Sequence, residues 1–224
     1  MIIVSLTISP VNNAEGVIVG ASKIARDITA QRHDQERIAT LGREAEHRSK
    51  NLLASVQATV VLSRADTSEG LKRAIEGRIQ ALANVHSLFV ESRWAGAELL
   101  TIARQELAPY STAAATSVRI SGPPVVLEPN TAQAIAVMLH ELATNAAKYG
   151  ALSAAEGRID LTWQRDTDGR LFIRWQETGG PPVQPPSRRG FGSRVIEQMV
   201  SQLRGTAHFD WRSDGLICEI TMQT

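Results

Sequence analysis

The sequence predicts an α+β protein in which two long helices precede a domain of mixed helices and antiparallel strands. Three observations indicate this class. Apolar residues recur at three- and four-residue steps from 38 to 60 and from 71 to 88, as in amphipathic helices. The second half alternates helix-like and strand-like runs. Two pairs of strand-like runs in it are joined by hairpin-forming dipeptides, Asp168-Gly169 and Asp214-Gly215.

The composition is that of an ordinary globular chain, with 43% hydrophobic residues and a formal net charge of +1. This balance gives no overall attraction to nucleic acid or to a membrane surface, so neither is an expected partner of this segment. The single cysteine, Cys218, cannot form an internal disulfide, which is typical of a reducing compartment. We see no apolar stretch long enough to span a bilayer and no signal peptide. We therefore expect a cytoplasmic location.

Residues 1–29 favour a β-hairpin, because β-rich runs at 2–8 and 17–24 flank a turn at 12–16. Two strands alone are rarely stable, so we expect this hairpin to be the tail of a larger domain. Its exposed edges could also pair with another chain, which leaves further oligomers open.

From residue 27 the pattern becomes helical. The first helix carries an apolar stripe at Ile38, Leu41, Ala45, Leu52, Val56 and Val60. Polar residues at 63–68 break it, and a second stripe follows at Leu71, Ile75, Ile79, Leu82, Val85 and Leu88. A two-helix hairpin cannot bury both stripes alone, so we expect a homodimer in which two hairpins form a four-helix bundle.

The later elements predict an α+β sandwich, with helices on one face of a sheet. Helices are expected at 98–107, after the cap residue Asn130, and at 193–203. Strands are expected at 117–121, 158–164, 171–177, 206–211 and 216–222.

One of these helices, the one that follows Asn130, carries chemically useful groups on one face. Glu141, Asn145 and Lys148 are spaced four and three residues apart, so they stack along the helix. A general base, a metal-binding amide oxygen and a phosphate-binding ammonium in a row suggest nucleotide chemistry. Each of them alone is most often a solvated surface residue, so the interpretation depends on further motifs.

Two glycine-containing loops supply those motifs. Glu177 ends a strand before Gly179 and Gly180, where backbone can approach a flat ligand and the carboxylate can accept a hydrogen bond from an exocyclic amine such as that of adenine. Gly190 and Gly192 lead into a helix whose N-terminus favours an anion. Each loop alone is also typical of an ordinary turn, but the three motifs in this order indicate a nucleotide site.

In this order the three segments resemble the N box and the two glycine boxes of the histidine-kinase ATPase domain, the Bergerat fold of the GHKL group. His140 and the run Trp175-Gln176-Glu177 resemble the His and the Trp-x-Glu that name the HWE histidine kinases. For His140 itself a packing role and a chemical role both stay open. The resemblance, from about residue 30 onward, implies dimerisation and histidine phosphotransfer helices at 30–94 and an α/β-sandwich ATP-binding domain at 95–224. Residues 1–29 resemble the C-terminal hairpin and exit of a PAS sensor domain.

The resemblance implies a role for each matching residue. His47, on the first long helix, matches the phospho-acceptor, and a neutral imidazole is a competent nucleophile near neutral pH. Glu141 would take or orient the imidazole proton, and Asn145 would hold the Mg²⁺ of ATP through its amide oxygen. Lys148 would contact phosphate, and Tyr149 would help to wall the nucleotide site.

The glycine boxes have implied roles too. Glu177 occupies the place of the aspartate that reads adenine in the commoner kinases. Gly179 and Gly180 would allow the nucleotide to approach closely, and Gly190 and Gly192 would flank its phosphates.

The region around His47 departs from the commoner histidine kinases, which carry an acid just after the phospho-acceptor. Here Arg48 follows His47 and Glu46 precedes it, so the base would be Glu141 alone or Glu46. Asn51 lies one turn beyond His47, where an amide could position water for dephosphorylating a partner.

The sequence therefore predicts the core of a two-component sensor histidine kinase. ATP with Mg²⁺ would phosphorylate His47, and the phosphoryl group would pass to an aspartate on a response-regulator receiver domain. Two alternatives stay open. One is an anti-sigma-type GHKL serine kinase, which lacks the two-helix hairpin. The other is a catalytically degenerate dimerising scaffold, which the intact Asn145, Lys148 and Glu177 disfavour.

Overall fold

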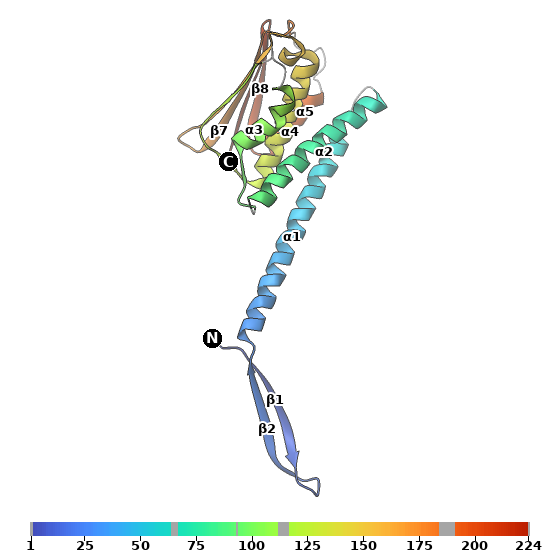
Figure 1. Cartoon of the computed structure of the whole chain (residues 1–224), viewed down its shortest axis with the longest axis vertical. Coiled ribbons are helices and arrows are strands. Elements are labelled where there is room, and N and C mark those ends of the chain that lie inside the picture. Colours follow the sequence, from blue (N-terminus) through green and yellow to red (C-terminus); the bar gives the residue numbers. More distant parts are fainter. Residues whose placement is uncertain (1, 64–66, 93, 112–116, 184–190, 224) are drawn as a thin grey trace. The chain divides into compact units, whose positions relative to one another are not determined.

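The chain divides into two compact units, Met1–Ser55 and Val56–Thr224, whose elements Figure 1 labels. The computed structural model describes residues 2–63, 67–92, 94–111, 117–183 and 191–223. One long helix, α1 (Thr29–Leu62), contains the boundary between the two units.

The first unit begins with the predicted β-hairpin. Strands β1 (Val4–Asn12) and β2 (Ile18–Asp27) pair antiparallel, with Val4 opposite Asp27. The side-chain oxygen of Asn13 closes the turn by accepting hydrogen bonds from the backbone N–H groups of Glu15 and Val17, at 3.1 and 2.9 Å. Every residue of both strands is exposed, so the apolar side chains face solvent on both sides of the ribbon.

Helix α1 carries the predicted apolar stripe, but the single chain leaves much of it uncovered. Ile38 and Leu41 are 69% and 56% exposed. A helix with such a stripe needs a partner surface. Helix α2 (Ser68–Glu91) follows and is capped by Thr67, whose hydroxyl accepts a hydrogen bond from the Gly70 N–H at 3.1 Å.

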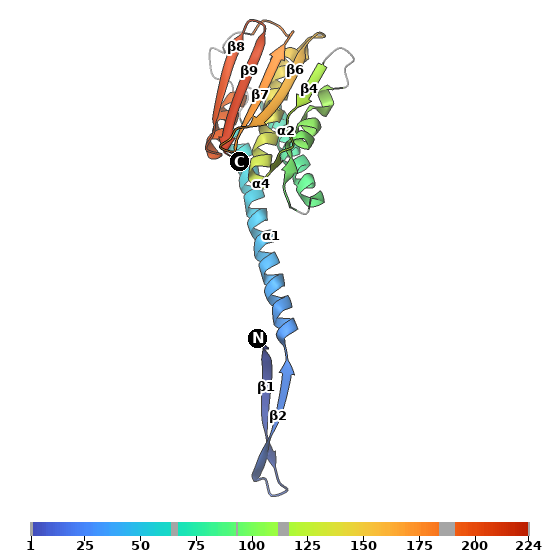
Figure 2. The same ribbon diagram turned by 90° about the vertical axis from the view of Figure 1, so that its left-hand side faces the viewer.

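A five-stranded mixed sheet forms one layer of the second unit, in the order β4-β6-β7-β9-β8. Strand β4 (Ser117–Ser121) runs parallel to β6 (Arg158–Arg165). The pairs formed by β7 (Arg170–Thr178), β9 (Gly215–Gln223) and β8 (Thr206–Arg212) are antiparallel. Helices α3 (Leu99–Leu107), α4 (Pro129–Tyr149) and α5 (Phe191–Gln202) lie on one face of the sheet, as predicted (Figure 2).

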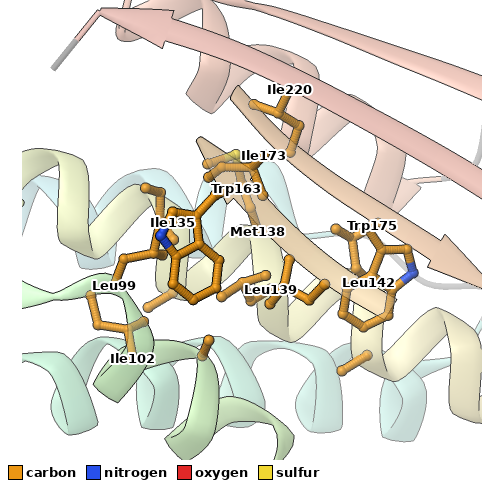
Figure 3. Packing of buried hydrophobic residues seen from close by; sticks show 14 of the residues in the cluster. Leu99, Ile102, Ile135, Met138, Leu139, Leu142, Trp163, Ile173, Trp175 and Ile220 are labelled. Atoms are coloured by element: carbon orange, nitrogen blue, oxygen red, sulfur yellow. The ribbon is translucent and has the colours of Figure 1, made fainter. Parts of the chain in front are cut away.

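The main core lies between the sheet and α4. Side chains from the sheet face those of α4 and α3 in one cluster (Figure 3), which includes Trp163, Ile173, Trp175, Ile220, Ile135, Met138, Leu139 and Leu142. Helix α4 also contacts α2 and α5, which explains why most of its surface is buried. A second, small cluster joins Leu82 of α2, Val137 of α4 and Val195 of α5, with Val56 and Met199 packed against it.

The structure corrects one predicted boundary and adds two short strands. Helix α4 begins at Pro129 after the cap residue Glu128, so Asn130 lies inside the first turn and is not the cap. Proline favours this position because its fixed φ fits a helix and its missing N–H is not needed there. Strands β3 (Ala97–Glu98) and β5 (Val126–Leu127) pair antiparallel, and single 3₁₀ turns occupy Ala108–Tyr110 and Ala151–Ser153.

None of the helices in the described ranges is long and apolar enough to cross a membrane.

Candidate active site

The three polar residues that were predicted on one face of α4 differ in burial, from the core to the solvent-exposed end of the helix. Glu141 is 8% exposed, Asn145 is half-buried and Lys148 is exposed. Tyr149, at the last position of the helix, is 73% exposed. The sequence placed these groups on one face, and the structure adds that only the carboxylate end of that face is buried.

The buried end is closed by an ion pair between α2 and α4. Arg78 donates from Nε to Oε1 of Glu141 at 2.7 Å and from Nη2 to Oε2 at 2.9 Å. The two side chains are 3% and 10% exposed. Arg78 also donates to the hydroxyl of Ser63, which in turn donates to the backbone carbonyl of Thr59 at 2.6 Å. Both oxygens of Glu141 are therefore engaged in this arrangement.

His140 lies where α2, α3 and α4 meet. Its Nδ1 is 3.3 Å from Oε2 of the buried Glu106 on α3. On α2, a Cβ added at Gly77 would lie only 2.5 Å from Nε2 of His140, so the ring packs directly on the backbone of that helix. This position favours the packing role for His140 over the chemical one.

Glu177 is held at the end of β7, and only 3% of the residue is exposed. Its Oε2 accepts a hydrogen bond from the Ala151 N–H at 2.9 Å, and its Oε1 accepts one from Nε1 of Trp175 at 3.0 Å. Burial raises the pKa of this carboxyl above its ordinary value, and the two hydrogen bonds oppose that shift.

Three glycines shape the space around these groups. A Cβ at Gly150 would lie 1.9 Å from Oε2 of Glu177, so only glycine leaves room for the carboxylate. Gly179 has a φ of +71°, and a Cβ there would lie 2.6 Å from the carbonyl oxygen of Glu156. A Cβ at Gly180 would lie 2.8 Å from Cα of Ala151. The first glycine box is thus packed against the end of α4.

The second glycine box is described only in part. Gly192, at the start of α5, comes so close to α4 that a Cβ would lie 2.8 Å from Nδ2 of Asn145 and 2.9 Å from Oε2 of Glu141. Gly190 lies outside the described residues. The structure therefore brings Glu141, Asn145 and Gly192 together, and separately brings Glu177 to the glycines that follow α4 and β7.

A surface cleft of about 520 Å³ lies near these loops, lined by Glu156, Arg158, Thr178 and Gly179. Side chains alternate along a strand, and Glu177 points to the helix side of the sheet while its neighbour Thr178 points to the other. The cleft therefore opens on the face opposite Glu177, and we do not include it in the candidate site.

The predicted phospho-acceptor belongs to the first unit. His47 is exposed on α1, and its Nδ1 is 3.4 Å from the amide Nδ2 of Asn51, one turn further on. Glu46 is also exposed, and its Oε1 is 2.7 Å from Nζ of Lys50. An accessible imidazole is what a nucleophile for an external phosphoryl group requires.

Comparison with known proteins shows which family the chain resembles. Residues 44–124 match the family model described as HWE histidine kinase. The chain thus resembles the HWE histidine kinases. A blue-light-activated histidine kinase of Rhizobium johnstonii is 37% identical over 220 residues, which cover 96% of this chain and 63% of that protein. One of Brucella ovis is 32% identical over 203 residues, which cover 88% of this chain and 42% of that protein. The chain thus spans less than two thirds of either relative's length.

Solved histidine kinases share the fold. The Erythrobacter litoralis EL346 blue-light activated histidine kinase gives a TM-score of 0.62 at 20% identity, covering 97% of this chain and 69% of that one. Its histidine kinase domain gives a TM-score of 0.56 at 17% identity, covering 77% of this chain and 95% of that one. The predicted α+β fold of a histidine kinase is confirmed.

Two residues of this site escaped the sequence analysis. Arg78 interrupts the apolar stripe of α2 between Ile75 and Leu82, and a charge at such a position is the signal of a buried ion pair. Gly150 caps the C-terminal end of α4, and it also makes room for Glu177.

Proposed function

We propose that this chain is the ATP-dependent core of a sensor histidine kinase and that His47 receives the γ-phosphoryl group of ATP. The observation that supports this most is the hydrogen bond between Oε2 of Glu177 and the Ala151 N–H, at 2.9 Å. It ties the carboxylate suited to read adenine to the end of the helix that carries Asn145 and Lys148. One region can thus hold both ends of a nucleotide.

The base end of the nucleotide would lie against Glu177. A carboxylate oxygen can accept more than one hydrogen bond, so Glu177 keeps acceptor capacity beside its contacts with Ala151 and Trp175. The exocyclic amine of adenine can use that capacity. Gly179 and Gly180 carry no side chain, so their backbone can border a flat base.

The phosphate end would lie along the outer part of α4. Mg²⁺ in such sites takes one or two protein oxygens and completes its shell with phosphate and water. The half-buried amide of Asn145 fits that demand, and no group of three or more His, Cys, Asp or Glu side chains gathers elsewhere in the described ranges. When bound, the ion would neutralise charge on the phosphates, and the exposed Lys148 would add to this.

The transfer itself is a displacement at phosphorus. An imidazole nitrogen of His47 forms the new P–N bond, the bond from the γ-phosphorus to the bridging oxygen breaks, and ADP leaves with that electron pair. Glu141 would take the imidazole proton on a remaining lone pair of its carboxylate, whose two oxygens each accept one hydrogen bond from Arg78, at 2.7 and 2.9 Å. Glu46, exposed and paired with Lys50 at 2.7 Å, is the alternative base.

The proposed function also implies two partners for this chain. The phosphoryl group would pass from His47 to an aspartate of a response-regulator receiver domain. The uncovered stripe of α1 would pair with that of a second copy in a four-helix bundle. The relatives are named for activation by blue light; for this chain we infer only the kinase core that it shares with them.

Labelling with γ-³²P ATP tests the proposal. We expect acid-labile, alkali-stable label on the wild type, no label on His47→Ala, and full label on His33→Ala, a control at another exposed histidine of α1. Acid-stable label would indicate a serine kinase. A dimer that binds no label would indicate a scaffold.

A second measurement tests the metal role of Asn145. Asn145→Asp should abolish labelling and weaken binding of Mg²⁺-ATP, because the extra negative charge repels the phosphates. Asn130→Asp places the same charge in the exposed first turn of α4, where the helix dipole favours it, and should change neither. Unchanged affinity of Asn145→Asp for Mg²⁺-ATP would contradict the role.

A further inference from the structure

We infer that Trp175 is a positioning residue for recognition of the adenine amine, acting through the carboxylate of Glu177. The inference rests on the proposed function, in which Glu177 reads the base. Trp175 itself is fully buried and would not touch the nucleotide. Its indole N–H would set where the carboxylate sits.

The two residues are adjacent on the inward face of β7. They are two positions apart, so their side chains point to the same side of the sheet. Nε1 of Trp175 donates to Oε1 of Glu177 at 3.0 Å. The indole ring lies in the main core with Leu142 of α4 (Figure 3), so its orientation is fixed by packing. The N–H is therefore a donor with a fixed direction.

The second carboxylate oxygen is held from the opposite side. Oε2 accepts from the Ala151 N–H at 2.9 Å, and the missing side chain of Gly150 leaves just enough space for it. One donor on each oxygen defines the plane of the carboxylate. A glutamate has three side-chain torsions to order, so a single tether would leave the carboxylate freer to rotate.

A carboxylate in a fixed position allows the site to bind a ligand that carries an amine more tightly than one that lacks it. The 6-amino group of adenine is a donor that can meet a carboxylate, whereas a purine without that group leaves the remaining acceptor capacity of Glu177 unused. Sites built to bind a donor discriminate strongly against analogues that lack it, provided the acceptor is in place. Losing the indole N–H should therefore cost discrimination more than general affinity.

The test compares ATP with purine riboside triphosphate, which lacks the 6-amino group. In the wild type ATP should bind more tightly. In Trp175→Phe, which keeps an aromatic ring but removes the N–H, ATP affinity should fall by roughly tenfold while that of the analogue stays nearly constant. The ratio of the two dissociation constants should therefore move toward one.

Trp163→Phe is the matched control. Trp163 is also buried in the sheet, on the neighbouring strand β6, and its Nε1 donates to the carbonyl of Pro123 at 2.8 Å and not to Glu177. The variant Trp163→Phe should lose comparable stability in thermal unfolding but keep the wild-type ratio of the two dissociation constants. If Trp175→Phe does not fold, replacement of Trp175 by 3-benzothienylalanine, which carries sulfur in place of the N–H, makes the same comparison with the ring shape preserved.

An unchanged ratio in the Trp175 variants, with normal ATP binding, would overturn the inference. A wild type that binds ATP and the analogue equally would instead refute the role of Glu177 on which it rests. A wild type that binds neither would refute the proposed function itself.

Discussion

Arg78 and Glu141 form a bidentate ion pair that joins α2 to α4, with N–O distances of 2.7 and 2.9 Å and almost no exposure of either side chain. A buried pair of this kind contributes less than its geometry suggests, because both charges were removed from water. Removal of one partner is costly, since the other charge is left buried alone.

Arg78→Gln should therefore lower the free energy of unfolding by about 3–5 kcal/mol in urea denaturation. The matched control is Arg73→Gln on the same helix. Arg73 pairs with Glu69 at 3.2 Å, but the two side chains are 76% and 63% exposed. The control should change stability by less than about 1 kcal/mol. The double variant Arg78→Gln/Glu141→Gln should recover part of the loss. Equal effects of Arg78→Gln and Arg73→Gln would show that the buried pair between Arg78 and Glu141 does not form in solution.

Gly150→Ala should reduce ATP affinity. The added methyl group would lie 1.9 Å from Oε2 of Glu177, so the carboxylate would have to leave the Ala151 N–H. Loss of an oriented carboxylate should weaken ATP binding by roughly tenfold or more, measured by calorimetry. Gly42→Ala, in open space on α1, should leave affinity unchanged and raise stability slightly through its better helix propensity. Full affinity of Gly150→Ala would mean that Glu177 is not the base-reading group.

Glu177 should make stability depend on pH in a defined direction. Burial raises its pKa in the folded state above the ordinary value of 4.5, and the hydrogen bonds from Ala151 and Trp175 offset only part of this. Below that ordinary value the carboxyl is protonated in both the folded and the unfolded protein, so the contribution of Glu177 to the free energy of unfolding is fully present. As pH rises through the folded-state pKa, ionisation of Glu177 lowers the free energy of the unfolded protein more than that of the folded protein, so this contribution to stability is lost.

Unfolding of the wild type and Glu177→Gln between pH 4 and 7 measures this. The wild type should lose stability relative to the glutamine variant as pH rises, and parallel curves would contradict the raised pKa.

Cys218 should be unreactive in the folded protein. Burial raises the pKa of its thiol to about 12, so hardly any thiolate forms at pH 8 and reagents cannot reach it. Titration with a thiol-reactive disulfide dye should give no signal in buffer and one thiol per chain in urea. Rapid reaction without urea would show that β9 opens locally.

Local signals in the sequence were sufficient for most of the second unit. The Asp168-Gly169 and Asp214-Gly215 turns lie between the strands they were expected to join, β6 with β7 and β8 with β9. Residue spacing also placed Glu141, Asn145 and Lys148 on one helix. These features depend on neighbours a few residues apart, which is the range over which periodicity carries information.

The features that were missed depend on distant contacts. Arg78 and Glu141 are 63 positions apart, and β3 pairs with β5 through only two residues each. The start of α4 was misplaced because a good cap residue, Asn130, competed with the stronger preference of Pro129 for the first helical position. The apolar stripe of α1 shows that a surface needs cover but does not specify what supplies it.

The close approach of Gly192 to Asn145 and Glu141 makes helix α5 sensitive to what lies beside that amide. Any group held beside Asn145 would therefore lie next to the first turn of α5. The same helix buries Val195 against Leu82 of α2, with Val56 of α1 packed on the same cluster. Any displacement of α5 would therefore reach α1 and α2 through contact between apolar side chains, with no change of charge.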